Sequence, residues 1–193
     1  MAHEPRQPNG ERWTYEALCL ARPEDLEAVM RCGVPPDLAR LSGWEFRGFN
    51  TPDLLALVGL KKFKKGFYRA DPSRPHHQGI QGYNVVVVQN RLGEPWIDVE
   101  RGGRPRRIGW YEVRRVDLAS AHHKYPNAVL IDYGASEKNF RGDPTRLLRD
   151  YLVQVYPDNF DLYLGKAYVP VGPLRLPIAY FVLERHNPSD LGA

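Results

Sequence analysis

The stretch Trp44-Glu45-Phe46-Arg47-Gly48-Phe49 alternates along the chain, with Trp44, Phe46 and Gly48 on one face and Glu45, Arg47 and Phe49 on the other. A period of two is typical of a β-strand. Short alternating segments continue as far as Tyr180-Phe181-Val182-Leu183, which Glu184-Arg185 follows. This order, from a tryptophan to an arginine, predicts a sheet that closes into a β-barrel.

The other strand candidates are separated by turn residues, and the 17 glycines and 17 prolines favour a turn-rich β architecture. The candidates lie near residues 62–69, 81–89, 95–99, 107–116, 128–133, 146–156, 160–170 and 176–185. The segment 146–156 also fits a helical period, so a helix stays open there. About eight to ten strands suffice for a barrel interior to hold a ligand. We therefore expect a mainly β fold with a single antiparallel β-barrel.

Helical signals stand at the start of the chain. The acids and proline of Pro23-Glu24-Asp25 mark a helix start, and apolar residues recur at helical spacing until Gly33. A shorter helix is expected over 36–41, and another over 54–60 to close one mouth of the sheet. The predicted organisation is an N-terminal tail and helical extension over 1–42, a barrel over 43–187 and a C-terminal tail over 188–193.

Composition indicates an ordinary soluble globular protein, with 42% hydrophobic and 26% charged residues. The net charge of +4 is low for a dedicated nucleic-acid binder. Met1 to Gly10 is polar, so we expect neither a signal peptide nor a membrane span, and a cytoplasmic location. Cys19 and Cys32 have no paired metal-ligand spacing and are expected to be reduced thiols.

The order of elements resembles the calycins, the group of lipocalins, fatty-acid-binding proteins and their relatives. That group has a tryptophan near the start of the first barrel strand, and lipocalins have an arginine near the end of the last strand that packs across it. Trp44 and Arg185 match these positions, and Ile131-Asp132-Tyr133 is similar to the lipocalin Thr-Asp-Tyr segment. The resemblance implies a lipocalin-like barrel that holds a ligand. Together with the expected cytoplasmic location, the predicted function is an intracellular, lipid-binding barrel that holds a small hydrophobic or amphipathic ligand.

The pairing of Trp44 with Arg185 also has a physical basis. A guanidinium over an indole face is a cation–π contact worth roughly 0.5–2 kcal/mol. Such a contact can close the narrow end of a barrel, so both residues are predicted to be barrel-closing.

Candidate ligand contacts come from the last two strands and the first. Aromatic lining is expected from Phe46, Tyr168, Tyr180 or Phe181, and a polar anchor from Lys166, Glu184 and Arg175. Lys166 shares a face with Tyr168, so its ammonium could point to an apolar interior, with Glu184 as its partner. The pair could hold the polar end of a fatty or aromatic acid. The alternatives are a solvated, outward-facing Lys166 and a surface-loop Arg175.

Catalysis and metal binding have weaker signals. The pairs His76-His77 and His122-His123 lack a companion acid or cysteine at ligand spacing, so no metal site is predicted. No cofactor is expected, although His186 could be an axial haem ligand, as in haem-carrying relatives of the calycin barrel. Asp132 is an acid on an apolar strand and could be a general base if burial raises its pKa. A small isomerase- or hydrolase-type enzyme using Asp132 or a histidine is therefore an alternative function, and a structural aspartate explains Asp132 equally well.

Two basic clusters support a third function. Lys61, Lys62, Lys64 and Lys65 interleave with Phe63, Phe67 and Tyr68, while Arg101, Arg104, Arg106 and Arg107 precede Trp110-Tyr111. Basic residues with aromatics suit single-stranded RNA or an anionic membrane surface. Lysine-rich strand edges that deter edge pairing explain them equally well. No nucleic-acid motif accompanies them, so a small apolar or amphipathic molecule is the expected partner.

Overall fold

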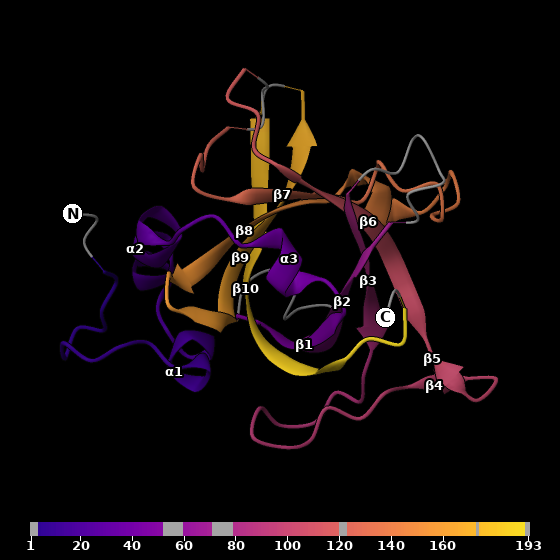
Figure 1. Ribbon diagram of the computed structural model, residues 1–193, viewed down its shortest axis with the longest axis horizontal. Coiled ribbons are helices and arrows are strands. Elements are labelled where there is room, and N and C mark those ends of the chain that lie inside the picture. The colour runs from indigo at the N-terminus through magenta and orange to yellow at the C-terminus, as the bar shows by residue number, and fades with distance from the viewer. Residues whose placement is uncertain (1–3, 52–59, 71–78, 120–122, 173, 192–193) are drawn as a thin grey trace.

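Eight strands form a closed antiparallel barrel in which strands that follow one another along the chain pair with each other (Figure 1). The computed structural model describes residues 4–51, 60–70, 79–119, 123–172 and 174–191. The barrel strands are β1 (Trp44–Asn50), β2 (Lys62–Arg69), β3 (Ile80–Val86), β6 (Arg107–Arg115), β7 (Val129–Asp132), β8 (Arg149–Tyr156), β9 (Asn159–Val171) and β10 (Leu174–Pro188). Because β1 pairs with both β2 and β10, the barrel closes, and the predicted fold class is confirmed.

Two details of the strand and helix prediction are changed by the structure, and a third is not tested by it. Residues 95–99 form no barrel strand, and the short strands β4 (Glu100–Arg101) and β5 (Arg104–Pro105) form a separate ribbon nearby. The segment 146–156, for which a strand and a helix were both possible, is mostly strand. Helical structure there is limited to a 3-10 turn, Pro144–Leu147, before β8 begins. The helix expected over 54–60 falls almost entirely outside the described residues.

Glycines make room for aromatic rings in the barrel interior. A Cβ at Gly48 would lie 2.5 Å from the ring of Phe63, and one at Gly165 would lie 2.0 Å from the ring of Phe181. Such contacts are shorter than packed atoms tolerate, so these two positions must stay small for the rings to lie across the strands. Alternation of large and small inward side chains is typical of small barrels.

One end of the barrel is closed. Helix α3 (Leu38–Leu41) lies across this end, and its Leu41 is fully buried against the interior (Figure 1). The guanidinium of Arg185 lies 4.5 Å from the ring centroid of Trp44, so the predicted contact is present at this end. Arg185 also donates to the backbone oxygen of Arg40 in α3. The turn into β1 passes through Gly43 at φ +84, a conformation that favours glycine.

Helices α1 (Tyr15–Cys19) and α2 (Pro23–Cys32) pack outside the barrel, against β8, β9 and β10 (Figure 1). The sequence predicted α2 but not α1. Leu18, Leu26 and Met30 of these helices are fully buried in one cluster with Leu164 and Val182 from the outer faces of β9 and β10. The barrel wall there is therefore buried on both faces.

Glu27 links α2 to the barrel wall. Its carboxylate accepts hydrogen bonds from Lys166 Nζ at 2.7 Å, Tyr180 Oη at 2.6 Å and Tyr125 Oη at 2.8 Å. Burial alone would raise the pKa of Glu27, but these hydrogen bonds outweigh it and lower the pKa to about 2.

We expect Glu27→Gln to lower the free energy of unfolding by about 1–3 kcal/mol near pH 7, because charged hydrogen bonds are lost. The folded pKa lies below the ordinary value of 4.5, so this contribution is full above that value and lost as pH falls toward about 2. Urea unfolding of the unchanged protein and of Glu27→Gln across this pH range measures the difference in their free energies of unfolding. A difference that does not depend on pH would contradict the assignment.

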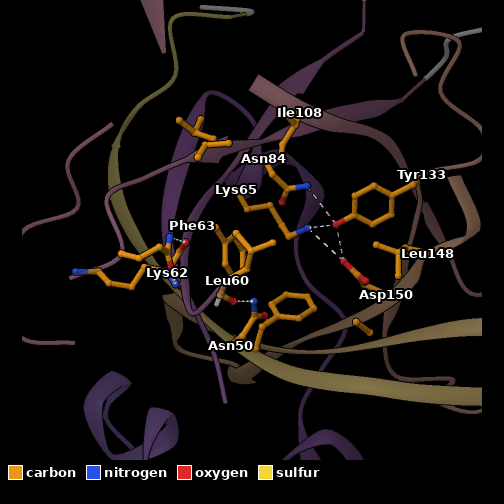
Figure 2. A pocket seen from close by; sticks show the side chains of 15 residues that line it. Asn50, Leu60, Lys62, Phe63, Lys65, Asn84, Ile108, Tyr133, Leu148 and Asp150 are labelled. Atoms are coloured by element: carbon orange, nitrogen blue, oxygen red, sulfur yellow. Dashed lines mark hydrogen bonds and ion pairs between the residues drawn. The ribbon is translucent and has the colours of Figure 1, made fainter. Parts of the chain in front are cut away.

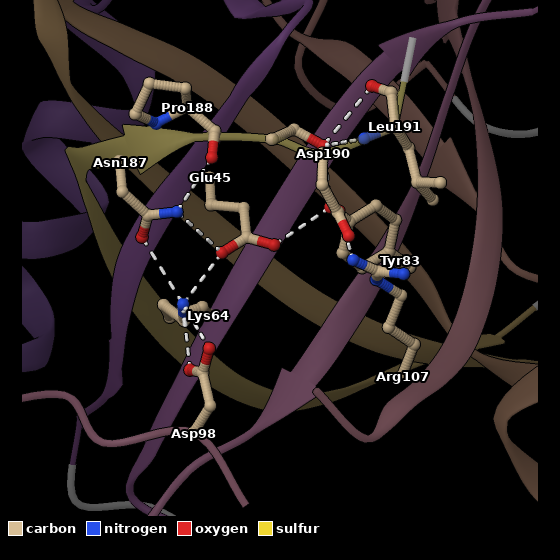
Figure 3. A network of polar contacts seen from close by, with 10 residues as sticks. Glu45, Lys64, Tyr83, Asp98, Arg107, Asn187, Pro188, Asp190 and Leu191 are labelled. Atoms are coloured by element: carbon tan, nitrogen blue, oxygen red, sulfur yellow. Dashed lines mark hydrogen bonds and ion pairs between the residues drawn. The ribbon is translucent and has the colours of Figure 1, made fainter. Parts of the chain in front are cut away.

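The chain end after β10 is held on the outer face of β1 to β3 by a polar network (Figure 3). At its centre, Lys64 Nζ lies 2.7 Å from Glu45 Oε2 and 2.8 Å from Asp98 Oδ2. Asn187 also contacts both Lys64 and Glu45. The side chains of Lys64 and Glu45 are only 5% and 4% exposed, so both charges depend on this pairing.

We expect Lys64→Met to lower the free energy of unfolding by about 3–5 kcal/mol, because it leaves the Glu45 carboxylate buried and uncompensated. The exposed neighbour Lys61 offers a matched control, and Lys61→Met should stay within about 0.5 kcal/mol of the unchanged protein. Denaturant unfolding compares the two. Equal losses in both variants would show that the network contributes little.

Candidate functional site: a cavity inside the barrel

A cavity of about 170 Å³ occupies the barrel interior at the mouth opposite α3. It lies among the end of β1, the start of β2 and the middle of β10, and its wall is mostly apolar. Leu60 and Ile108 stand at its rim, where they are exposed. The lining residues are Asn50, Leu60, Lys62, Phe63, Lys65, Asn84, Val85, Val86, Gln89, Ile108, Tyr133, Leu148, Asp150, Ala167 and Phe181.

The cavity contains one buried polar cluster, made by Lys65, Tyr133, Asp150 and Asn84 (Figure 2). Lys65 Nζ donates to Tyr133 Oη at 2.7 Å and to Asp150 Oδ2 at 3.2 Å. Tyr133 Oη in turn donates to Asp150 Oδ2 at 3.0 Å, and Asn84 Nδ2 lies 3.4 Å from Tyr133 Oη. Four elements thus bring these groups together: the amine comes from β2, the amide from β3, the carboxylate from β8 and the phenol from the residue after β7.

Charge in this cluster is balanced and almost fully removed from water. The side chains of Lys65 and Asp150 are 2% and 3% exposed. Burial lowers the pKa of Lys65, while the negative charge of Asp150 opposes that change. Burial, and then the same negative charge, raise the pKa of Tyr133 well above its ordinary value. Tyr133 therefore stays a neutral phenol that can donate a hydrogen bond.

Aromatic rings surround the ammonium of Lys65. Its Nζ lies 4.5 Å from the ring centroid of Tyr111, 5.1 Å from that of Tyr133 and 5.2 Å from that of Phe181. Cation–π attraction of this kind stabilises a buried positive charge. Two of the three ammonium donors are used by Tyr133 and Asp150, and no further hydrogen bond from Lys65 Nζ is found within the described part of the chain.

Two of the residues predicted to contact a ligand lie inside the barrel. Phe181 lines the cavity. Phe46 is fully buried deeper in the interior, where it packs edge-on against Phe67 and Tyr163.

The other five predicted ligand contacts do not line this cavity: Lys166, Tyr168, Arg175, Tyr180 and Glu184. Lys166 and Tyr180 bind Glu27 of α2 on the outer side of the wall, and Tyr168 stacks on Tyr151 there. The prediction that Glu184 is the partner of Lys166 was wrong, because Glu184 accepts a hydrogen bond from Arg47 Nε at 2.7 Å instead. Arg175 lies on β10, and its Nε is buried without a hydrogen bond from the described residues.

The candidate catalytic residue Asp132 is on the outer side of β7, since its neighbours Ile131 and Tyr133 face inward. It forms ion pairs with Arg114 at 3.1 Å and Arg149 at 3.0 Å. His186 is exposed near the end of β10 and does not line the cavity. His76, His77 and His122 lie outside the described residues. Across the described ranges, no group of three histidine, cysteine or acidic side chains is placed to hold a metal ion.

The lysine cluster of β2 is not a basic surface. Lys62, Lys64 and Lys65 are all buried, and only Lys61 of the four is exposed. The ammonium of Lys62 donates hydrogen bonds to Asn90 Oδ1 and to the backbone oxygens of Arg91 and Glu94. Arg101, Arg104 and Arg106 are exposed, whereas Arg107 pairs with Asp190.

The sequence did contain a signal for Lys65. Phe63, Lys65 and Phe67 share one face of β2, so alternation places this lysine among apolar neighbours. The cluster of four lysines suggested a surface instead. Tyr133 and Asp150 come from other strands, and no local pattern joins them to Lys65.

No protein-family model, curated protein or solved structure matches the chain. Among the described helices, none has the length and apolar character needed to cross a membrane. The chemistry of the cavity is therefore the basis for a function.

Proposed function

We propose that the barrel binds a small, largely apolar molecule whose single polar group meets the cluster of Lys65, Tyr133, Asp150 and Asn84. The observation that carries this proposal is a charge-balanced lysine–aspartate pair buried in a cavity whose wall is mostly apolar. Ligand pockets are generally apolar concavities with a few convergent polar groups. The spare ammonium donor of Lys65 and the amide of Asn84 supply hydrogen bonds to such a group.

Charge balance favours an uncharged ligand over an acid. Lys65 already faces Asp150 at 3.2 Å, so a carboxylate would place a second negative charge beside Asp150 with little water to screen it. An alcohol, a carbonyl or an amide adds no charge. The fatty or aromatic acid expected from the sequence thus fits this cavity less well than a neutral molecule.

Size favours a ligand of about one ring. The cavity of about 170 Å³ is close to the roughly 150 Å³ of an engineered cavity that binds benzene. Phe63 and Phe181 line the cavity, so their rings are available to pack against an aromatic ligand. A long acyl chain would extend out of the mouth past Leu60 and Ile108.

The architecture is compatible with a calycin-like carrier. Among the described residues, α3 and the Trp44–Arg185 contact close one end of the antiparallel barrel and leave the other mouth for ligand entry. We include membership of that group in the proposal, together with a cytoplasmic location. The latter rests on Cys19 and Cys32, which are both unpaired, as is usual in a reducing compartment.

Native mass spectrometry of the freshly purified protein, compared with the denatured sample, tests for a co-purified small molecule. Calorimetric titration with benzyl alcohol and with benzoate then tests the preference for a neutral ligand. We expect benzyl alcohol to bind at least about tenfold more tightly, a difference of about 1.4 kcal/mol. Tighter binding of benzoate would contradict the charge argument, and binding of neither ligand, with no co-purified molecule, would contradict the carrier function.

A further inference from the structure

We propose that the side-chain amine of Lys65 forms a reversible imine with small aldehydes or ketones that enter the cavity. This inference rests on the proposed function, because the carbonyl compound must first occupy the cavity. It gives the ligand a chemical class and gives Lys65 a covalent role.

Geometry favours this reaction at Lys65. Its Nζ faces a cavity large enough for one ring, and a carboxylate and a phenol lie 3.2 Å and 2.7 Å from it. Imine formation needs an amine that gives up a proton, and a group nearby to receive it. Asp150 is within reach to receive it, and burial lowers the pKa of Lys65. Tyr133 is placed to pass a proton between nitrogen and oxygen.

The reaction balances in protons and charge. Asp150 takes one proton from the Lys65 ammonium, and the nitrogen lone pair forms a bond to the carbonyl carbon as the C=O π electrons move to oxygen. Through Tyr133, a second proton passes from nitrogen to that oxygen. The C–O bond then breaks, the oxygen takes the proton held by Asp150 and leaves as water, and a protonated imine remains.

The product keeps the charge pattern of the resting site. The protonated imine carries the same positive charge as the ammonium, and it stands beside the same Asp150 carboxylate. No new charge is buried by the reaction, which removes the main cost of covalent chemistry in an apolar interior.

Lys166 provides a matched comparison within the chain. Its Nζ also lies close to a carboxylate and phenols, at 2.7 Å from Glu27 Oε2 and 2.7 Å from Tyr180 Oη. Burial lowers its pKa too. Lys166 lies outside the barrel and does not line the cavity, so it separates the effect of the cavity from that of a perturbed amine.

The test is reductive trapping. The full-length protein is incubated with benzaldehyde and sodium cyanoborohydride, and intact-mass measurement and peptide mapping locate the benzyl groups. We expect Lys65 to be labelled at least about tenfold faster than Lys166, and saturating benzyl alcohol to slow the labelling of Lys65 alone. The double variant Lys65→Met/Asp150→Leu, which leaves no unpaired charge, should lose the fast label.

Two outcomes separate the two proposals. If benzyl alcohol binds but Lys65 is labelled no faster than Lys166, the imine is overturned and the cavity remains a non-covalent site. If benzyl alcohol does not bind and Lys65 is not labelled, the proposed function itself fails.

Discussion

Asp150→Leu is expected to lower the free energy of unfolding by about 3–5 kcal/mol near pH 7, because it leaves the Lys65 ammonium buried without its counterion. The side chains of Lys65 and Asp150 are 2% and 3% exposed, so little water reaches them to replace the lost partner. Tyr133 alone remains as a hydrogen-bond partner for the ammonium, and a neutral phenol does not offset a charge.

The double variant Lys65→Met/Asp150→Leu should recover most of this loss, to within about 1 kcal/mol of the unchanged protein, because a buried ion pair contributes little compared with apolar residues of similar size. The penalty in Asp150→Leu should also shrink as pH rises toward about 10. The pKa of Lys65 is already lowered by burial, so the folded variant can release the proton below the ordinary lysine pKa of 10.5.

Urea unfolding of the single and double variants near neutral and alkaline pH measures both effects. If the single and double variants are equally stable, Lys65 and Asp150 are not coupled, and the balanced charge proposed for the cavity is absent.

Ala167→Phe is expected to weaken the binding of benzyl alcohol by more than about 100-fold, or about 2.7 kcal/mol, because a phenyl ring from β9 would occupy the cavity. Ala167 lines the cavity and is 7% exposed. Since the ring enters space that is already empty, the free energy of unfolding should change by less than about 2 kcal/mol.

Val171→Phe is the matched control, because Val171 lies on the same strand, is 50% exposed and does not line the cavity. Titration calorimetry with both variants separates a filled cavity from a general effect of an added ring. Unchanged affinity in Ala167→Phe would place the ligand elsewhere on the molecule.

The strand pattern of this chain could be read from the sequence because alternation is a local property. Trp44, Phe46 and Gly48 share one face of β1 as predicted, and this face points inward. The contact between Trp44 and Arg185 followed from their places at the start of the first barrel strand and near the end of the last. Which face of β9 points inward could not be read in this way. Leu164 on its outer face is covered by α1 and α2, so both faces of the strand are apolar. Alternation of apolar and polar residues then does not tell which face points inward.

The polar cluster in the cavity could not be predicted from the sequence for a related reason. Lys65 belongs to a run of lysines whose composition indicates a surface, although the same alternation that was applied to Lys166 places Lys65 with Phe63 and Phe67. Asp150 and Tyr133 come together only through the pairing of β7 with β8, which depends on long-range contacts. Burial then makes the lysine and the aspartate depend on each other.

The most direct test of the central claim, that the barrel interior is a ligand site, is a crystal structure of the protein soaked with 4-bromobenzyl alcohol. The account predicts one anomalous bromine peak inside the barrel near Phe63 and Phe181, with the hydroxyl group within hydrogen-bonding distance of Lys65 or Asn84. An interior filled only by side chains or water, with the ligand bound elsewhere, would contradict it.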